Sequence, residues 1–311
     1  MKNNNTHISS HTVSKKSGSY FALTLTSIIW GTTWVASRIG VQHVPGLQIS
    51  YIRQFIAGSL LLIFFFMRGE KLPTWPQFRW LFILSIFTFV LSNGFSTWSV
   101  KYVSSGLAAL ISALYPLCVV IIEMIFFKRN NNSKLTFIGL FVGLAGVAIV
   151  FYENAFHEQP EGYSYGVILG LIAMIGWSIG TIYIARNKYQ MNPYYAIGWQ
   201  MFLGSFLICL LALTTSNNIP FSEIPSQTWL VIVYLISFGS LVAFVAFIYT
   251  VKYLSPAIAS LYAYINPLVA MTVGSILLNE PLTLNLIIGA LITLAGVYIV
   301  NYSIKIRERH L

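Results

Sequence analysis

The stretch YVSSGLAALISALYPLCVVIIEMIFF at residues 102–127, followed by LTFIGLFVGLAGVAIV at 135–150, occurs a second time in this chain. The second copy reads YLSPAIASLYAYINPLVAMTVGSILL at 253–278 and LNLIIGALITLAGVYIV at 284–300. Tyr102 and Pro116 lie 151 residues before Tyr253 and Pro267, so the two copies keep one spacing. The chain therefore contains two related halves, and each half ends in two apolar segments, the first of which is interrupted by proline.

The composition excludes a soluble protein. Hydrophobic residues make up 57% of the 311 residues and charged residues only 8%, against about 25% charged in an ordinary soluble domain. All eight acids are Glu, which argues against enzymes that hold a metal diphosphate with paired aspartates. Cys118 and Cys209 lie in apolar runs without a metal-ligand spacing, so we expect neither a metal nor a cofactor.

The apolar segments predict the fold class. A membrane span needs about 20 mostly apolar residues, and ten segments meet that length: 19–42, 46–68, 76–99, 104–127, 134–151, 163–186, 194–214, 227–250, 256–278 and 284–303. We therefore expect an all-α membrane protein with ten transmembrane helices. Residues 1–18 are polar and are predicted to form a disordered cytoplasmic tail. No small-residue cleavage site follows the first span, which favours an uncleaved signal anchor.

The basic residues predict the orientation, because cytoplasmic loops carry an excess of Lys and Arg. With both termini inside, 15 of the 18 basic residues are cytoplasmic: Lys2, Lys15, Lys16, Arg68, Lys71, Arg79, Lys128, Arg129, Lys134, Arg186, Lys188, Lys252, Lys305, Arg307 and Arg309. Arg38, Arg53 and Lys101 remain on the outer side. We expect a multi-pass protein of the inner (cytoplasmic) membrane with the lipid bilayer as a partner. The net charge of +10 lies in short loops and does not predict nucleic-acid binding.

The ten spans divide into two sets of five, 19–151 and 163–303, joined by an outer linker at 152–162 and followed by a cytoplasmic tail at 304–311. Because five is odd, the second half begins on the opposite side of the membrane and is inverted. Gln54 and Gly58 match Gln200 and Gly204 at a spacing of 146, which supports the division. Inverted halves are the known basis of alternating access in transporters. A larger scaffold is the alternative use of such a duplication.

The motifs of the repeat also carry a family resemblance. Those motifs are Trp30-Gly31-Thr32-Thr33-Trp34, the mid-span prolines, Asn279-Glu280-Pro281-Leu282-Thr283, Gly289 and Leu294-Ala295-Gly296-Val297. With them the chain resembles the EamA-type transporters of the drug/metabolite transporter superfamily over nearly all residues after 18. The resemblance implies ten helices, cytoplasmic termini, a central cavity and export or exchange of small metabolites. Lys128-Arg129 stand where the family's usual Glu would end the fourth span.

Polar and aromatic residues within the spans predict where a substrate binds. Pro116 and Pro267 interrupt matched helices, which points either to helix-break hinges at the binding site or to packing kinks. The candidates for substrate binding are Trp30, Trp34, Arg53, Asn93, Trp98, Tyr115, Trp177, Tyr262 and Asn266. An aromatic and amide lining suits an amphipathic or zwitterionic small molecule. For each aromatic residue, helix packing is the alternative.

Three charged residues need a separate account. Glu123, the only acid within a span, is either the coupling group that binds a proton or a carboxylate paired with Lys128 or a neighbouring hydroxyl. Arg53 either holds a substrate carboxylate or extends to the outer headgroups. Arg38 is nearer the end of its span, and we expect it to anchor the membrane interface.

The sequence thus predicts a transporter of small organic metabolites such as amino acids. It works by alternating access as an exporter or exchanger on a gradient, since no GxxxxGK[ST] nucleotide loop occurs. Efflux of drugs or other amphipathic compounds is the first alternative. A membrane-embedded enzyme, a receptor or a channel is the alternative of a different class. Gly139-x-x-x-Gly143 either packs helices within one chain or joins two chains in a homodimer.

Overall fold

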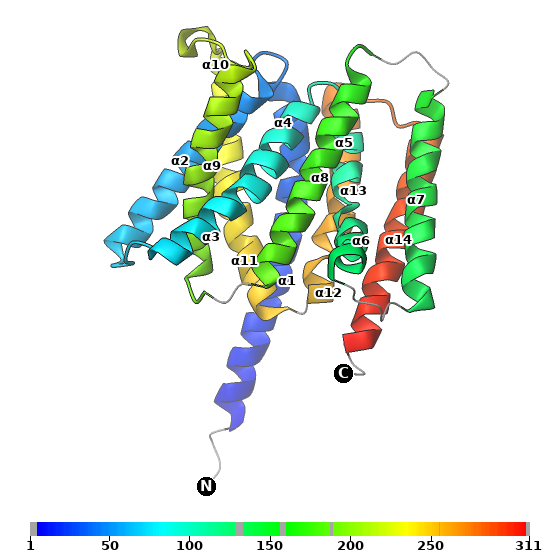
Figure 1. Ribbon diagram of the computed structural model, residues 1–311. Helices are drawn as coiled ribbons and strands as arrows, with labels where there is room; N and C mark the ends of the chain where they lie inside the picture. Colours follow the sequence, from blue (N-terminus) through cyan, green and yellow to red (C-terminus); the bar gives the residue numbers. More distant parts are fainter. Residues whose placement is uncertain (1–4, 128–132, 156–159, 187–188, 255, 309–311) are drawn as a thin grey trace.

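The computed structural model describes residues 5–127, 133–155, 160–186, 189–254 and 256–308, and all of its regular elements are helices (Figure 1). Several charged residues of the topology argument lie outside these residues: Lys2, Lys128, Arg129, Lys188 and Arg309. The first residues of α1 and the last residues of α14 lie at the same end of the helix bundle (Figure 1). We call this the termini end.

The first half contains the first five predicted spans. Their helices are α1 (Asn5–Gly40), α2 (Gly46–Met67), the continuous series α3 (Trp75–Ser85), η1 (Ile86–Gly94) and α4 (Phe95–Ser99), the broken pair α5 (Ser105–Ser112) and α6 (Tyr115–Phe127), and α7 (Lys134–Ala155).

The second half repeats this order. Its helices are α8 (Tyr163–Ala185), α9 (Pro193–Thr214), the series α10 (Ser226–Tyr234), η3 (Leu235–Val242) and α11 (Ala243–Tyr253), the broken pair α12 (Pro256–Ala259) and α13 (Tyr262–Leu278), and α14 (Leu284–Glu308). A single 3-10 turn, η2 (Phe221–Glu223), precedes α10.

The predicted all-α membrane fold is confirmed. Among the described residues, eight stretches are long and apolar enough to cross a membrane, and Tyr262–Leu278 is a shorter apolar helix. Together with α1 they correspond to the ten predicted spans. Helix α1 begins at Asn5, although the sequence predicted a disordered tail over residues 1–18. The difference has a physical reason: once the apolar span has nucleated a helix, each added residue needs only one further hydrogen bond, and the polar segment before Gly18 contains no Gly or Pro to stop it.

The two halves are interleaved, and each main contact joins an element of one half to an element of the other. Helix α2 packs along α9 and α7 along α14, so the second spans pair with each other, as do the fifth spans. Helix α1 packs on α13 and α11, while α8 packs on α5, α6 and η1. A two-fold rotation that exchanges the halves places the contacts of α1 on those of α8, as the inverted repeat predicts.

Glycines allow α7 and α14 to approach closely. A Cβ on Gly139 would lie 2.8 Å from the Val300 nitrogen and 2.9 Å from the Gly296 oxygen. A Cβ on Gly143 would lie 2.6 Å from the end of the Leu117 side chain. The Gly139-x-x-x-Gly143 spacing therefore serves packing within one chain, and it supplies no argument for a homodimer.

The third span of each half contains a π-helical stretch, η1 in the first half and η3 in the second. The fourth spans are broken instead: α5 stops at Ser112 before α6, and α12 stops at Ala259 before α13. π-Helical stretches and broken helices occur frequently at functional sites, since they leave backbone groups available for other partners. η1 and the α5–α6 break line one central cavity, and η3 contacts two of its lining residues, Trp30 and Arg53.

Candidate functional site

A cavity between the two halves encloses about 940 Å³ of empty space, part of it open to solvent. Its walls come from α1, α2, η1, α4, α5, α6, α8, α11 and α13, so both halves contribute. The lining residues are Trp30, Thr33, Trp34, Ser37, Arg53, Ser92, Asn93, Ser96, Thr97, Ser99, Ala108, Ala109, Ser112, Ala113, Tyr115, Gly170, Ala173, Trp177, Phe244, Tyr262, Ala263 and Asn266.

The cavity brings together eight of the nine residues that the sequence named as substrate-binding candidates: Trp30, Trp34, Arg53, Asn93, Tyr115, Trp177, Tyr262 and Asn266. The ninth, Trp98, is buried away from it, with its ring 6.1 Å from Phe95 and 5.5 Å from Tyr165. Residues 98 and 97 are neighbours on a helix and point in different directions, so Thr97 lines the cavity while Trp98 packs behind it.

Aromatic rings form the wall of the cavity nearest the termini end. The Trp30 ring centroid lies 5.2 Å from Tyr262, 5.1 Å from Phe247 and 6.4 Å from Trp177. Tyr115 stacks on Tyr262 at 6.2 Å, with 17° between the ring planes. The cluster joins α1, α6, α8, α11 and α13, so it ties the two halves together beneath the cavity.

Arg53 is the only charged residue among those that line the cavity. It is 6% exposed, and its Nε donates to the Ser240 hydroxyl of η3 at 2.7 Å. Within the described part of the chain, no hydrogen bond from Nη1 or Nη2 occurs. A buried guanidinium with an open fork is the geometry that binds a carboxylate with two parallel hydrogen bonds. The structure thus places Arg53 inside the protein, away from lipid headgroups.

The π-helical stretches hold polar side chains at the cavity wall. Gln54, next to Arg53 on α2, donates to Asn93 Oδ1 of η1 at 3.4 Å, and Asn93 Nδ2 donates to the Thr88 carbonyl at 3.1 Å. In the second half, Trp30 Nε1 donates to the Gly239 carbonyl of η3 at 3.2 Å. Backbone carbonyls that a regular α-helix would use internally therefore fix the side chains of Asn93 and Trp30.

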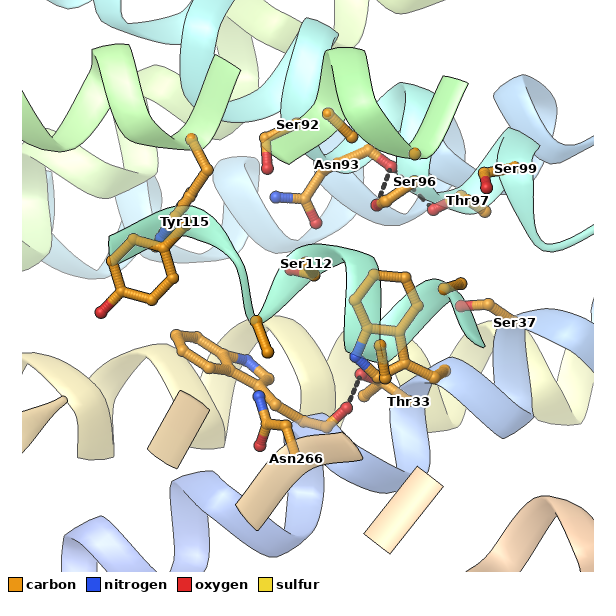
Figure 2. Close-up of a pocket in the computed structure, with 18 of the residues that line it drawn as sticks. Thr33, Ser37, Ser92, Asn93, Ser96, Thr97, Ser99, Ser112, Tyr115 and Asn266 are labelled. Atoms are coloured by element: carbon orange, nitrogen blue, oxygen red, sulfur yellow. Dashed lines mark hydrogen bonds between the residues drawn. The ribbon is translucent and has the colours of Figure 1, made fainter. Parts of the chain in front are cut away.

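Sequence reasoning missed the hydroxyl groups of the lining: Thr33, Ser37, Ser92, Ser96, Thr97, Ser99 and Ser112. Figure 2 shows Ser92, Asn93, Ser96 and Thr97 together on one side of the cavity and Thr33 on the other, with Ser112 between them. A signal was present, because the segment SNGFSTWS at 92–99 is unusually polar for a membrane span. Single Ser and Thr residues elsewhere carry no such signal.

The predicted hinges do not line the cavity, but they lie beside residues that do. Pro116 lies in the first turn of α6, where its missing N–H leaves no helix bond broken. Pro267 lies inside α13, next to Asn266. The orientation of the Asn266 amide that satisfies its neighbours has its nitrogen donating to the Ser27 and Tyr262 carbonyls at 2.7 and 3.2 Å. The carbonyl oxygen of that amide then remains available to a ligand.

Glu123 lies on α6 away from the cavity lining. Its Oε1 is 3.9 Å from Arg186 Nη2, and the two side chains are 22% and 44% exposed. The sequence named Lys128 as the alternative partner, and Lys128 lies outside the described residues. Arg186 directly follows α8, at the termini end of the bundle.

Arg38 and Glu280 meet at the opposite end. Arg38 Nη1 donates to the carbonyls of Val100 and Lys101 at 2.5 and 2.7 Å, and its Nε is 3.9 Å from Glu280 Oε1. Glu280 accepts a hydrogen bond from the Ser105 backbone nitrogen at 2.8 Å and one from the Ser105 hydroxyl at 2.6 Å. The second half thereby caps the first turn of α5 in the first half. Arg38 binds protein carbonyls here, where the sequence predicted an interface anchor.

Asn279 and Gly274 allow Glu280 to reach α5. Asn279 ends α13 with φ 53°, a left-handed conformation that Asn adopts at lower cost than most residues. A Cβ on Gly274 would lie 2.5 Å from both Glu280 Oε2 and Ser105 Oγ. The Asn279-Glu280 pair and Gly274 are thus parts of one arrangement. Among the described residues, no group of three or more His, Cys, Asp or Glu could hold a metal ion.

Comparison with known proteins agrees with this architecture. The model of the EamA-like transporter family matches residues 17–152 and 164–302, one match in each half. The uncharacterized inner membrane transporter YedA of Escherichia coli K12 is 32% identical over 268 residues, covering 86% of this chain and 84% of the relative. The uncharacterized transporter YoaV of Bacillus subtilis is 23% identical over 288 residues, covering 91% and 96%.

A solved structure described only as "Crystal structure of protein" superposes on this chain with a TM-score of 0.62. It is 16% identical and covers 92% of this chain and 97% of its own. At that identity the likeness supports the fold alone.

Proposed function

The chain belongs to the EamA-like transporter family, and from that premise we propose that it carries small organic solutes bearing a carboxylate, such as amino acids. It is a multi-pass transporter of the inner membrane. Alternating access between the two inverted halves, with export or exchange of the solute, is the mechanism we propose.

Arg53 carries the proposal. It is the one charged residue of the lining, it is 6% exposed, and Ser240 holds its Nε. Burying a guanidinium without a counter-charge is costly, since the charge loses its hydration. A substrate carboxylate on the open Nη1–Nη2 fork supplies that counter-charge, and it does so in the water-poor setting where a charge-assisted hydrogen bond is strong.

The remaining lining suits the rest of such a solute. Trp30, Trp177 and Tyr262 offer apolar and aromatic surface to a side chain. The hydroxyls around Asn93 offer both donors and acceptors without adding charge. These groups tolerate more than one solute shape.

The hydroxyl-lined and aromatic parts of the cavity lie towards opposite ends of the bundle. Ser37 on α1 and Ser99 on α4 lie towards the end opposite the termini, while the aromatic cluster around Trp30 and Phe247 lies on the termini side. With the termini in the cytoplasm, as the basic residues predict, the aromatic cluster lies towards the cytoplasmic side. Exchange of conformations between the halves then opens the other side.

The test of the proposal is counterflow into proteoliposomes loaded with a mixed pool of amino acids and organic acids. Arg53→Gln is expected to weaken carboxylate-bearing solutes about 10- to 100-fold, the value of one lost charge-assisted pair. Arg68→Gln is the matched control, because Arg68 directly follows α2 at the termini end and lies over the Phe64 ring. Full carboxylate transport by Arg53→Gln contradicts the proposal, and Arg53-independent transport of cationic amphiphiles favours the drug-efflux alternative.

Proton coupling through Glu123 is a proposal of its own. Its carboxylate lies near Arg186 at the termini end, where a proton could bind from the cytoplasm. Glu123→Gln is expected to flatten the pH profile of transport at unchanged substrate affinity. Arg186→Gln serves as the control for loss of the ion pair, and an unaltered pH profile in Glu123→Gln removes the coupling role.

A further inference from the structure

The turn between α2 and α3 exposes apolar side chains at the edge of the helix bundle. Figure 1 shows this turn on the side away from α7 and α14. Met67, Leu72 and Trp75 are all exposed there, Trp75 at 67%. Trp75 is the one exposed ring among the eight tryptophans, all of which the structure describes. A tryptophan at the end of a membrane span lies at the level of the lipid headgroups, so this corner of the protein faces lipid.

Two basic side chains lie beside these apolar ones. Lys71 is exposed in the turn, and Arg79 is exposed four residues after Trp75, on the same face of α3. Phe82 and Ile83, three and four residues further on, are exposed as well. Arg79 thus lies within a lipid-facing stripe of α3, from which a long basic side chain reaches the headgroups.

Neither base is paired with an acid in the part of the chain that the structure describes. Glu70 is the nearest acid in the sequence, and its Oε1 accepts from Asn192 Nδ2 at 3.0 Å. Tyr195 Oη donates to the Lys71 carbonyl at 3.1 Å, so the start of α9 also holds the backbone of the α2–α3 turn. The turn is therefore fixed in place, and it presents two positive charges without a counter-charge from any described residue.

The matched turn of the second half lacks these bases. At the 146-residue spacing of the second spans, residues 68–79 correspond to 214–225, between α9 and α10 at the opposite end of the bundle. Trp75 then matches Phe221, which is also exposed. Residues 68–79 contain three bases and one acid, a net charge of +2, whereas 214–225 contain one acid, a net charge of −1. Both turns expose an aromatic ring, so the fold of the turn does not require the bases, and they are specific to the termini end.

The location of the turn gives the chemistry of the missing counter-charge. With the termini in the cytoplasm, as the basic residues predict, the turn lies at the cytoplasmic leaflet of the membrane. The anions of a membrane surface are lipid phosphates, and the cytoplasmic leaflet is the one that carries a negative surface potential. A soluble anion would reach Lys71, but it would leave the exposed stripe of α3 beside Arg79 uncovered. A lipid with a net negative charge meets both, since its headgroup carries the anion and its acyl chains cover the stripe.

We propose that Lys71, Trp75 and Arg79 form a binding site for an anionic phospholipid of the cytoplasmic leaflet. The two bases contact the headgroup, the ring of Trp75 lies beside the glycerol region, and the acyl chains follow the exposed face of α3. Arg68 is not part of the site, because its guanidinium lies over the Phe64 ring, 4.9 Å from the centroid. The site lies outside the central cavity, so it is independent of the solute that the cavity binds.

The test is quenching of tryptophan fluorescence by brominated lipids, with the purified full chain in bilayers of phosphatidylglycerol and phosphatidylcholine. Bromine is placed on the acyl chains of one lipid or of the other. Trp75→Phe, measured in parallel, gives the signal of the remaining tryptophans, and the difference is the signal of Trp75. The binding constant of phosphatidylglycerol at Trp75 is expected to exceed that of phosphatidylcholine about tenfold or more, because each base contributes about fivefold. Equal binding constants overturn the proposal.

The contribution of each base is measured by substitution. Lys71→Gln and Arg79→Gln are each expected to lower the preference for phosphatidylglycerol about fivefold. Arg79→Lys keeps the charge and is expected to retain most of the preference. Both positions are exposed, so these variants are expected to keep the Tm of the unaltered protein. A preference that survives both Gln substitutions contradicts the site.

Lys252→Gln is the matched control. Lys252 is an exposed base at the same end of the bundle, in the last turn of α11, and its Nζ lies 5.4 Å from the Tyr253 ring centroid. The control is expected to leave the preference at Trp75 unchanged. Equal losses in Lys252→Gln and Arg79→Gln would mean that the whole cytoplasmic surface attracts the lipid, and the proposal of a site at the α2–α3 turn is then wrong.

Discussion

Removing the carboxylate of Glu280 is expected to destabilise the protein, because this side chain from the second half caps α5 of the first. Glu280 accepts from the Ser105 nitrogen at 2.8 Å and from the Ser105 hydroxyl at 2.6 Å. Hydrogen bonds to a charged group contribute about 1.5–3 kcal/mol each. The Arg38 contact at 3.9 Å is 30% exposed on the arginine side and adds about 0–1 kcal/mol.

Two effects make the total loss of stability smaller than the sum of these contributions. The Glu280 side chain is 11% exposed, so water replaces part of the lost bonding, and the Ser105 hydroxyl has the Ala270 carbonyl at 3.5 Å as a second acceptor. We therefore expect Glu280→Ala to cost about 2–4 kcal/mol of unfolding free energy. A chain of this size has an unfolding entropy of about 0.65 kcal/mol/K, so the apparent Tm is expected to fall by about 3–6 °C.

The assay is thermal denaturation in detergent, followed as loss of the monodisperse peak in size-exclusion chromatography. Glu223→Ala is the control, since Glu223 is an exposed acid of the short turn before α10. A double-mutant cycle with Ser105→Ala is expected to show a coupling of about 1–2 kcal/mol. A Tm shift of Glu280→Ala that equals the control, or additive effects in the cycle, refutes the capping role.

Further substitutions test other contacts. A Cβ added by Gly139→Ala would lie 2.8 and 2.9 Å from backbone atoms of α14, whereas one added by Gly143→Ala would lie 2.6 Å from the end of a side chain. We therefore expect Gly139→Ala to lower the unfolding free energy by about 1–3 kcal/mol and Gly143→Ala to lower it less. Equal melting temperatures of the two variants contradict this. Ser240→Ala removes the hydrogen-bond acceptor of the buried Arg53 guanidinium and is expected to weaken counterflow of carboxylate-bearing solutes about three- to tenfold and to lower the Tm by about 2–5 °C. Asn279→Gly keeps the left-handed φ of 53° and leaves stability unchanged, whereas Asn279→Val is expected to cost about 1–2 kcal/mol in the same thermal assay.

The membrane class, the spans and the relation of the halves follow from local properties of the sequence. Apolar length and charge placement act along the chain, and the repeat spacing can be counted without coordinates. Part of the candidate site follows in the same way, because amide and charged residues are rare enough within spans that candidates such as Arg53 and Asn93 stand out.

The choice of which side chains face inward depends on the packing of the helices. Thr97 lines the cavity and Trp98 does not, although the two are adjacent in the sequence. Hydrophobic periodicity cannot tell a helix face against the cavity from one against lipid or the core, because membrane spans carry apolar residues on every face. The partners of the polar groups also come from distant parts of the chain: Ser240 for Arg53, 187 residues away, and Ser105 for Glu280, 175 residues away. These pairings depend on how the two halves pack against each other and not on the local sequence.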